Sequence, residues 1–414
     1  MLYEQDFLKG RKRREYMRTL VVMRGAPGCG KSTFVQENRL APYALCADSI
    51  RELFESPVMD DEHGVMQLSQ KNDKRVWQLL FQLLEERMQR GELCIVDATH
   101  SRPKDFSKYK DLMEKYRYRA YCVDFTDIPI DVCKQRNLMR PEYKRVPENV
   151  IDVMYARFAN FPVPNYFKVI SHDDHDALND VVHEYKPTDA NAYSKVVVFG
   201  DIHGCYEPMK EYFESHPFDR DALYVFTGDY VDRGIQNDKV VSWLLEHYQE
   251  RNVVLLQGNH ERWLIEYANG EYDEEIRNGG RDRCKSSMFF EHTIPQLSQF
   301  RKKDLRELCR RFRAVAYLSF DGRRYFISHA GVGFMPESIV KVKAETFIRG
   351  NGKYEDAVDE RFERHESERN PDLYQIHAHR NVNCIPIHPF EHSFNLCDRV
   401  EFGGGMRILE ITKD

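Results

Sequence analysis

The chain lacks a long run of apolar residues, and its first residues lack the apolar core of a signal peptide. A helix that crosses a bilayer needs about 20 consecutive apolar residues, so we expect no membrane segment and no membrane partner. The ten cysteines stand singly, without a C-x-x-C pair. This spacing argues against a zinc ribbon and against a disulfide framework. Free thiols are typical of a reducing compartment, and the sequence therefore predicts a cytoplasmic protein.

The sequence also lacks an excess of positive charge, because its formal net charge is -6 over 414 residues. General affinity for nucleic acid usually requires a basic surface, so contact with nucleic acid would need a local basic groove. One basic cluster lies near the N-terminus, at Lys9 and Arg11 to Arg14. We expect it to be a solvated segment, the alternative being contact with a polyanionic substrate.

The length and the 42% of hydrophobic residues are sufficient for two domains, each with its own core. Strand-like and helix-like segments alternate over residues 1–170, which predicts an α/β domain with a parallel sheet. Within it, residues 74–90 have the pattern of an amphipathic helix, residues 131–139 that of another helix, and residues 93–97 and 117–125 that of strands. A polar stretch over 171–194 predicts a linker or the last element before one, and a second α/β domain is expected over 195–414.

The first domain opens with a phosphate-binding pattern. Residues 20–23 are typical of a short buried strand, and Gly25 to Ser32 fit G-x-x-x-x-G-K-[ST] before a predicted helix. Glycines allow backbone N–H groups to surround phosphate oxygens, while the lysine contacts the β/γ-phosphates and the hydroxyl binds Mg²⁺. The pattern predicts ATP and Mg²⁺ bound by Gly25, Gly28, Gly30, Lys31, Ser32 and Thr33.

Three further features fit a kinase. Asp48 and Arg51 follow the next predicted strand, where a carboxylate can accept a proton and an arginine can hold a phosphate. Asp97 ends a buried strand, as a magnesium-site carboxylate does. Arg136 and Arg140 have helical spacing and could neutralise charge on the transferred group. The alternatives are a surface ion pair for the first two residues and a solvated helix face for the arginines.

The motifs GAPGCGKST, CADSIR, VDATH and RNLMRPEYKRVP over residues 18–170 resemble those of the 5′-hydroxyl polynucleotide kinase family. The resemblance implies that Asp48 is the general base and that Arg51 contacts the acceptor's 3′ phosphate. It also implies that Arg136 and Arg140 are lid arginines on the ATP phosphates.

The second domain carries a series of polar motifs, each after an apolar strand. In chain order they are GDIHG (Asp201, His203), GDYVDRG (Asp229, Asp232, Arg233), GNHE (Asn259, His260, Glu261), SHAG (His329) and HAH (His377, His379). Ligands at the carboxyl ends of several strands converge on one edge of a sheet. Carboxylate, imidazole and amide oxygen ligands suit divalent ions such as manganese, iron or zinc, and a shared carboxylate is typical of a two-metal centre.

These motifs resemble those of the calcineurin-like binuclear metallophosphoesterases, which implies an α/β domain with a two-sheet β core. The resemblance implies that Asp201 and His203 bind one ion, that Asp229 bridges, and that Asn259 and His329 bind the second ion. It further implies a general-acid role for His260 and a phosphate clamp formed by Arg233 and Arg262. The last motif leaves two choices: alignment favours His379, but Ala378 replaces the usual glycine, so His377 is a second candidate ligand.

Together the two halves resemble the two-module polynucleotide kinase-phosphatases of bacterial and phage RNA repair, without their ligase module. The resemblance implies 5′ phosphorylation and removal of 3′-phosphate or 2′,3′-cyclic phosphate. It implies ATP, Mg²⁺ and two Mn²⁺ as cofactors, RNA ends rather than DNA ends as the favoured partner, and a separate ligase; a homo-oligomer is left open. The C-terminal segment SFNLCDRVEFGGGMRILEI also resembles the family's terminal strands. The family has an acidic residue there, and the pair Cys397 and Asp398 leaves its position ambiguous.

Two other interpretations are compatible with the motifs, since a fold does not fix a substrate. One is a small-molecule kinase fused to a protein-serine/threonine or dinucleotide polyphosphate phosphatase. The other is a scaffold that binds ATP and nucleic acid without catalysis, which the near-complete set of catalytic residues disfavours.

Overall fold

The computed structural model describes residues 18–60, 64–183, 185–278, 286–380 and 385–414. The chain divides into two compact units, of which the N-terminal one extends to Tyr185 and includes Ser338–Ala344. The C-terminal unit comprises Lys186–Glu337 and Glu345–Asp414. The basic cluster at Lys9 and Arg11 to Arg14 lies outside the described residues.

The N-terminal unit is built on a five-stranded sheet in the order β2-β5-β1-β6-β7, and all of its strand pairs are parallel. Its strands are β1 (Thr19–Arg24), β2 (Ala44–Cys46), β5 (Cys94–Asp97), β6 (Arg119–Asp124) and β7 (Lys168–Ser171). A separate hairpin is formed by β3 (Val58–Asp60) and β4 (Val65–Gln67). The central strand β1 is buried on both faces, as parallel strands covered by helices are.

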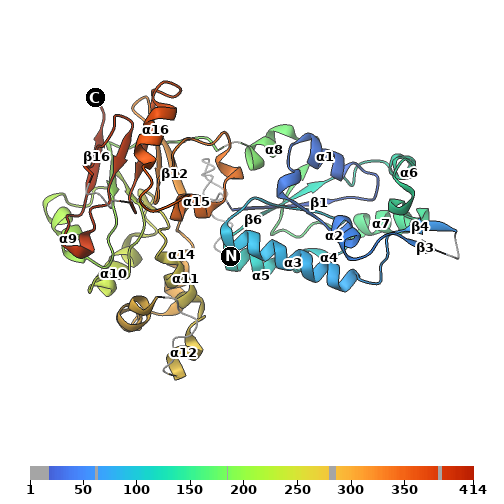
Figure 1. The fold of residues 1–414 in the computed structure, drawn as a ribbon, viewed down its shortest axis with the longest axis horizontal. Helices are drawn as coiled ribbons and strands as arrows, with labels where there is room; N and C mark the ends of the chain where they lie inside the picture. Colours follow the sequence, from blue (N-terminus) through green and yellow to red (C-terminus); the bar gives the residue numbers. More distant parts are fainter. Residues whose placement is uncertain (1–17, 61–63, 184, 279–285, 381–384) are drawn as a thin grey trace. The chain divides into compact units, whose positions relative to one another are not determined.

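Helices cover both faces of this sheet (Figure 1). They are α1 (Lys31–Glu37), α2 (Ala47–Phe54), α3 (Asp73–Arg90), α4 (Pro103–Ser107), α5 (Lys110–Tyr116), α6 (Ile130–Leu138), α7 (Glu148–Asn160) and α8 (His175–Val182), with short 3₁₀ turns η2 (Ala41–Tyr43) and η3 (Glu142–Lys144). Alternate residues of β1 enter opposite cores. Leu20 and Val22 pack with α2 to α5, and Val21 and Met23 pack with α1, α6, α7 and α8.

The C-terminal unit contains two sheets, in the orders β11-β10-β9-β16 and β15-β14-β13-β12-β8. Their strands are β8 (Thr188–Asp189), β9 (Lys195–Phe199), β10 (Ala222–Phe226), β11 (Val253–Leu255), β12 (Val315–Phe320), β13 (Arg323–Ser328), β14 (Leu373–His377), β15 (Ser393–Asn395) and β16 (Ile408–Thr412). Apolar residues of both sheets meet in one buried cluster, which includes Val198, Val225, Leu318 and Ile327. The unit is therefore a sandwich of two mixed sheets.

The helices of this unit lie outside the sandwich (Figure 1). They are α9 (Tyr206–Ser215), α10 (Asn237–His247), α11 (Glu261–Asn269), α12 (Asp273–Asn278), α13 (Ile294–Leu297), α14 (Lys302–Cys309), α15 (Ala344–Arg349) and α16 (Val358–Glu366), with the π-helical turn η4 (Phe289–Thr293) and the 3₁₀ turn η6 (Val400–Phe402). The 3₁₀ turn η5 (Ile339–Lys341) belongs to the N-terminal unit. Helices α9, α10, α11 and α14 share a core with the outer face of β9 and β10. The predicted fold class, a parallel α/β domain before an α/β domain with a two-sheet core, is confirmed.

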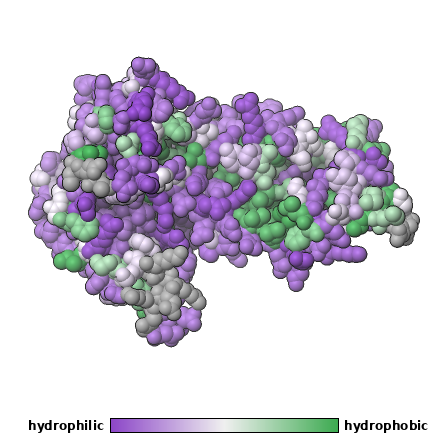
Figure 2. All heavy atoms as spheres, in the orientation of Figure 1, coloured by the Kyte–Doolittle hydropathy of each residue, from purple (hydrophilic) through white to green (hydrophobic). Residues whose placement is uncertain are grey.

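Hydrophilic side chains cover most of the visible face of each unit, and hydrophobic ones gather over the middle of the N-terminal unit and near the hairpin of β3 and β4 (Figure 2). At that hairpin Met59 and Met66 are exposed. None of the helices in the described residues combines the length and apolar character that a membrane crossing requires.

Candidate active sites

The loop between β1 and α1 has the backbone of a phosphate-binding turn. Gly25, Gly28 and Gly30 have φ values of 155°, 82° and 108°, which residues with a Cβ rarely adopt. A Cβ on Gly28 would lie 2.2 Å from the carbonyl oxygen of Cys133, so the approach of α6 also requires glycine here. No acidic residue occupies the first turn of α1. The backbone N–H groups that begin this helix can therefore receive an anion.

The lysine and serine of the motif are already oriented by the loop. Lys31 is buried, and its Nζ donates to the carbonyl oxygens of Gly25 (2.8 Å) and Ala26 (2.9 Å). Ser32 Oγ donates to Asp97 Oδ2 at 2.7 Å, which joins the loop to the end of β5. A hydroxyl beside a carboxylate is an oxygen donor set that suits Mg²⁺.

The remaining nucleotide-binding candidate, Thr33, lies exposed in the first turn of α1. The structure places it in the helix that follows the phosphate loop, and its role in nucleotide binding stays a prediction.

Asp48 and Arg51 lie one turn apart on α2 and are in direct contact. Arg51 Nη1 donates to Asp48 Oδ1 at 2.7 Å, and Arg140 Nη2 lies 3.7 Å from Asp48 Oδ2. The second terminal nitrogen of Arg51 donates to Asp73, the first residue of α3. The structure thus brings three predicted residues into one network and adds Asp73, which no sequence motif indicated.

The predicted lid arginines lie in the last turn of α6 (Arg136) and just after that helix (Arg140). The side chain of Asn137 holds the segment that follows the helix, because it donates to the Val146 carbonyl (2.8 Å) and accepts from the Val146 N–H (3.1 Å). Arg136 is exposed, and its Nη1 lies 3.8 Å from the point where a Cβ on Gly30 would stand. Arg136 therefore lies beside the phosphate loop, while Arg140 lies beside Asp48.

In the C-terminal unit, the predicted ligands follow β9, β10, β11, β13 and β14, on loops with strained backbone. Among the described residues, ten that are not glycine have positive φ, and five of them lie in these loops. They are His203, Asp229, Asp232, Arg233 and His379, with φ of 47°, 50°, 80°, 73° and 63°. Such conformations cost free energy and cluster at functional sites, which is consistent with side chains aimed at a shared centre.

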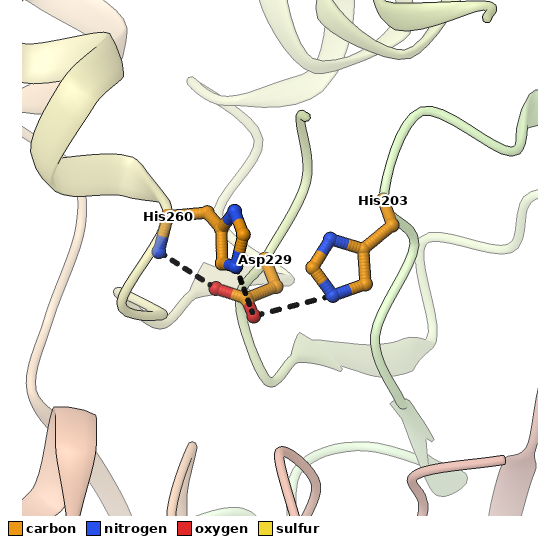
Figure 3. Close-up of side chains that lie close together, drawn as sticks. All are labelled: His203, Asp229 and His260. Carbon is orange, nitrogen blue, oxygen red and sulfur yellow. Dashed lines mark hydrogen bonds and ion pairs between the residues drawn. The ribbon is translucent and has the colours of Figure 1, made fainter. Parts of the chain in front are cut away.

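Asp229 is the centre of this site. Its Oδ2 lies 3.4 Å from His203 Nε2, 4.0 Å from His260 Nε2 and 3.3 Å from His329 Nε2. Figure 3 shows the imidazoles of His203 and His260 directed at the Asp229 carboxylate from two different loops. The His260 N–H also donates to Asp229 Oδ1 at 3.0 Å.

Two groups of potential ligands share Asp229. One contains His203 and His260, and the other contains His329 and His379; within each group the ligand atoms lie within 4.8 Å of one another. A single carboxylate common to both groups is the arrangement expected of a bridging ligand.

The other predicted ligands adjoin these groups. Asn259 Oδ1 lies 3.1 Å from His329 Nε2, and Asp201 Oδ1 lies 3.6 Å from His329 Nδ1. The His379 N–H donates to Asp201 Oδ2 at 3.1 Å. The imidazole of His377 is instead directed at Asp359 Oδ1 (2.8 Å) and the Ala378 carbonyl (2.9 Å). The structure therefore places His379, and not His377, in the group around Asp229.

Burial and charge set the ionisation of this cluster. Burial alone lowers the pKa of His329, but the charge of Asp229 and the hydrogen bond to it raise that pKa to about 9. Burial, and then the charge of His329, lower the pKa of His379 to about 2. Burial raises the pKa of Asp229, but the surrounding histidines, His329 first, hold it well below its usual value. Asp229 is thus ionised and His379 neutral near neutral pH, the forms that bind metal, whereas His329 would release its proton when a metal ion binds.

The two predicted phosphate-clamp arginines differ in their surroundings. Arg233 Nη1 lies 3.5 Å from His203 Nε2 and donates to Glu401 Oε1 at 2.5 Å. Arg262 Nε donates instead to Glu266 Oε1 at 2.7 Å, one turn along α11. The structure brings Arg233 to the cluster, and the clamp role of Arg262 stays a prediction.

Three carboxylates support the site without having been assigned a role from the sequence. Glu261 is fully buried and accepts hydrogen bonds from the N–H groups of Asp229, Tyr230 and Gly258, which shapes two of the loops. Asp232 Oδ2 lies 2.8 Å from His260 Nδ1 and orients that imidazole. Both belong to motifs visible in the sequence.

Glu401 in η6 is the third carboxylate. Its side chain is 3% exposed, and it lies 168 positions after Arg233, its partner. The carboxylate of Asp398 instead accepts a hydrogen bond from Arg407 Nη2 at 2.8 Å. The acidic residue that the tail brings to this site is therefore Glu401 rather than Asp398.

The residues present fit divalent ions. The cluster combines buried carboxylate, imidazole and amide groups, the donor types of manganese, iron and zinc sites. Asp201 Oδ1 is buried and has no hydrogen-bond partner among the described residues. Unsatisfied buried polar atoms cost free energy, and coordination of metal ions would satisfy such atoms.

Family models match both halves of the chain. Residues 194–401, half of the chain, match the model of the calcineurin-like phosphoesterase family, and the chain belongs to this family. Residues 20–161 match a family model described as an AAA domain. The chain thus joins a P-loop, kinase-like domain to a metallophosphoesterase domain. The first implies nucleotide binding, the second implies divalent metal ions, and together they indicate kinase and phosphatase activity.

Several solved structures are similar to this chain. A candidate diadenosine tetraphosphatase is 14% identical over 56% of this chain and 99% of its own, with a TM-score of 0.37. A protein serine/threonine phosphatase from Saccharomyces cerevisiae is 15% identical over 53% and 72%, with a TM-score of 0.34. A cold-active protein tyrosine phosphatase of a Shewanella species is 16% identical over 55% and 78%, with a TM-score of 0.34. These similarities do not identify a substrate.

Proposed function

We propose that the protein is a bifunctional nucleic-acid end-healing enzyme. In this proposal it phosphorylates 5′-hydroxyl ends with ATP and removes 3′-phosphate or 2′,3′-cyclic phosphate. The observation that carries the proposal is the contact between Asp48 and Arg51 on α2 (2.7 Å), with Arg140 3.7 Å from the same carboxylate. A base next to a phosphate-binding arginine suits an acceptor whose hydroxyl lies beside a phosphate, as it does at a polynucleotide end.

In the kinase reaction, the phosphate loop and Lys31 hold the β- and γ-phosphates of ATP. Ser32 Oγ and Asp97 would hold Mg²⁺, which neutralises phosphate charge when bound. Asp48 accepts the proton of the acceptor hydroxyl through Oδ2, since Oδ1 accepts from Arg51. Arg136 and Arg140 then stabilise the charge that develops on the transferred group.

In the phosphatase reaction, Arg233 binds the substrate phosphate at the edge of the ligand cluster. Two divalent ions, one held by Asp201 and His203 and the other by Asn259 and His329 with Asp229 shared, would neutralise the phosphate and activate water for in-line attack. His260 donates the proton that the leaving oxygen needs, because Asp232 holds its Nδ1 and leaves Nε2 directed at the reaction centre. Mn²⁺ is the ion we propose, on the basis of the mixed nitrogen and oxygen ligands.

The two activities are complementary at a broken strand. A strand with a 5′-hydroxyl and a 3′-phosphate lacks both groups that a conventional ligase joins. An enzyme that adds the first phosphate and removes the second would prepare this substrate for a separate ligase. RNA is the substrate we favour, because cleaved RNA carries these end groups.

Two variants test the proposal by separating the reactions. Asp48→Ala should abolish transfer of labelled γ-phosphate to a 5′-hydroxyl oligonucleotide and leave 3′-phosphate release unchanged. His329→Ala should have the opposite effect, because His329 lies only in the phosphatase cluster. Failure of the wild-type protein to label any RNA or DNA acceptor would contradict the proposal, and hydrolysis of phosphopeptides or dinucleotide polyphosphates alone would favour the signalling alternative.

A further inference from the structure

Arg51 is held between two carboxylates that come from different helices. Its Nη1 donates to Asp48 on α2 at 2.7 Å, and its Nη2 donates to Asp73 at the start of α3. The Arg51 side chain is 13% exposed, whereas those of Asp48 and Asp73 are 43% and 46% exposed. Arg51 Nε is buried and has no hydrogen-bond partner within the described residues. The contacts of Arg51 are therefore made by its two terminal nitrogens.

Asp48 cannot anchor Arg51 with the same strength throughout the proposed reaction. As a general base it must turn a lone pair to the acceptor hydroxyl and then carry the proton, and a protonated carboxyl is a poor partner for a guanidinium. Asp73 has no such task and keeps its hydrogen bond with Nη2. An arginine anchored only through Asp48 would lose its orientation at the moment when the acceptor phosphate must stay in place.

We infer that Asp73 is a positioning residue for the acceptor phosphate, which acts by fixing the guanidinium of Arg51. This inference rests on the kinase function proposed above. Arg51 keeps further N–H groups on its terminal nitrogens after both carboxylates are bound, because a guanidinium has five. These groups bind the phosphate that follows the 5′-terminal nucleoside of the acceptor.

The anchor is part of a rigid element. Asp73 begins an 18-residue helix whose Val76 and Leu80 are fully buried, and Ile50 of α2 lies in the same core cluster. Since α2 and α3 pack on one core, the distance between Arg51 and Asp73 is set by the fold. A rigid support of this kind is what a phosphate-positioning group requires.

Removal of Asp73 would have two opposite effects on the strength of phosphate binding. Loss of a negative charge would strengthen phosphate binding, whereas loss of the hydrogen bond would free the guanidinium and weaken it. The Asp73 carboxylate is nearly half exposed, so solvent and salt screen its charge. The Arg51 side chain is largely buried, so its hydrogen bond keeps its strength. The positioning effect therefore dominates, and we expect the KM for acceptor to rise about tenfold, the value of one charge-assisted hydrogen bond.

The test uses the full-length protein, ATP and two acceptors. One is a 5′-hydroxyl dinucleotide with a normal phosphodiester, and the other has a neutral methylphosphonate in its place. Asp73→Ala should raise the KM for the phosphodiester acceptor about tenfold. The KM for ATP, the kcat at saturating acceptor and the KM for the methylphosphonate acceptor should stay within about twofold of wild type. Asp73→Asn should show the same change, and Asp73→Glu should restore part of the affinity.

Asp111→Asn is the matched control, because Asp111 lies in the first turn of α5 and is exposed. It removes the same favourable charge at a helix N-terminus and should leave all four constants unchanged. The inference is overturned if the KM for the phosphodiester acceptor falls or is unchanged in Asp73→Ala and Asp73→Asn. It is equally overturned if both acceptors weaken together, which would mean a structural role. Failure of the wild-type protein to phosphorylate either acceptor would instead reject the kinase function itself.

Discussion

Replacement of Asp232 by asparagine tests how the phosphatase site protonates its leaving group. Asp232 Oδ2 lies 2.8 Å from His260 Nδ1, and the two side chains are 2% and 5% exposed. Asparagine has almost the same shape but cannot stabilise a positively charged imidazole. We therefore expect the substitution to preserve the fold and the ligand cluster while weakening His260 as an acid.

The size of the effect follows from the contact that is lost. A buried hydrogen bond to a charged group contributes about 1.5–3 kcal/mol, which corresponds to a loss of about 10- to 150-fold in kcat. The pKa of His260 is raised: burial lowers it, but the charge of Asp229 and the hydrogen bond to Asp232 outweigh burial. Asparagine removes one of these causes, so the pKa falls. Because a general acid acts in its protonated form, the decline in activity at alkaline pH should move to lower pH.

The assay compares two substrates with different leaving groups. An alcohol, such as a ribose 3′-oxygen, needs a proton to leave, whereas p-nitrophenolate leaves readily without one. Asp232→Asn should therefore lower kcat for a 3′-phosphate end by the full factor and kcat for p-nitrophenyl phosphate by much less. An equal loss with both substrates, or a loss of bound metal measured by mass spectrometry, would refute the assignment of His260 as the acid.

Three other substitutions, one control substitution and one treatment give further tests. Asp97→Ala should lower kinase kcat about 10- to 100-fold, as loss of a metal-site carboxylate does, without affecting phosphate release. Gly258→Ala should lower phosphatase kcat about 100-fold, since the new Cβ would lie 2.2 Å from Asp229 Oδ1 and displace the shared carboxylate; kinase kcat should not change. Glu401→Gln should raise the phosphatase KM about threefold, a modest value because the ion pair is partly solvated, whereas Asp398→Asn should not. Removal of metal with a chelator should abolish phosphatase activity, and Mn²⁺ should restore it.

The fold could be predicted largely because strands and helices depend on local patterns. The helix expected at residues 74–90 is α3 (Asp73–Arg90), and the strand expected at residues 93–97 is β5 (Cys94–Asp97). The phosphate loop and the metal motifs follow strands directly, so their positions were fixed once the strands were identified. Convergence of ligands on Asp229 follows from the same rule, since strand ends of one unit meet at one edge.

The residues that escaped prediction are those whose roles depend on packing between distant segments. Asp73 lies 22 positions after Arg51 and belongs to no motif, and Glu401 lies 168 positions after Arg233. Only the packing of α3 against α2, and of the tail against the ligand loops, brings these pairs together. The sequence also left the choice between His377 and His379 open, because both lie in one short motif. Only the fold shows that His377 forms a hydrogen bond with Asp359.

End healing is tested most directly with wild-type protein and one RNA that has a 5′-hydroxyl and a 3′-phosphate. The RNA is incubated with γ-labelled ATP, Mg²⁺ and Mn²⁺, and both ends are then analysed. We expect label at the 5′ end and a 3′ end that periodate oxidises, which requires a free cis-diol. An RNA with neither change, under conditions in which the protein hydrolyses p-nitrophenyl phosphate, would contradict a role in end healing.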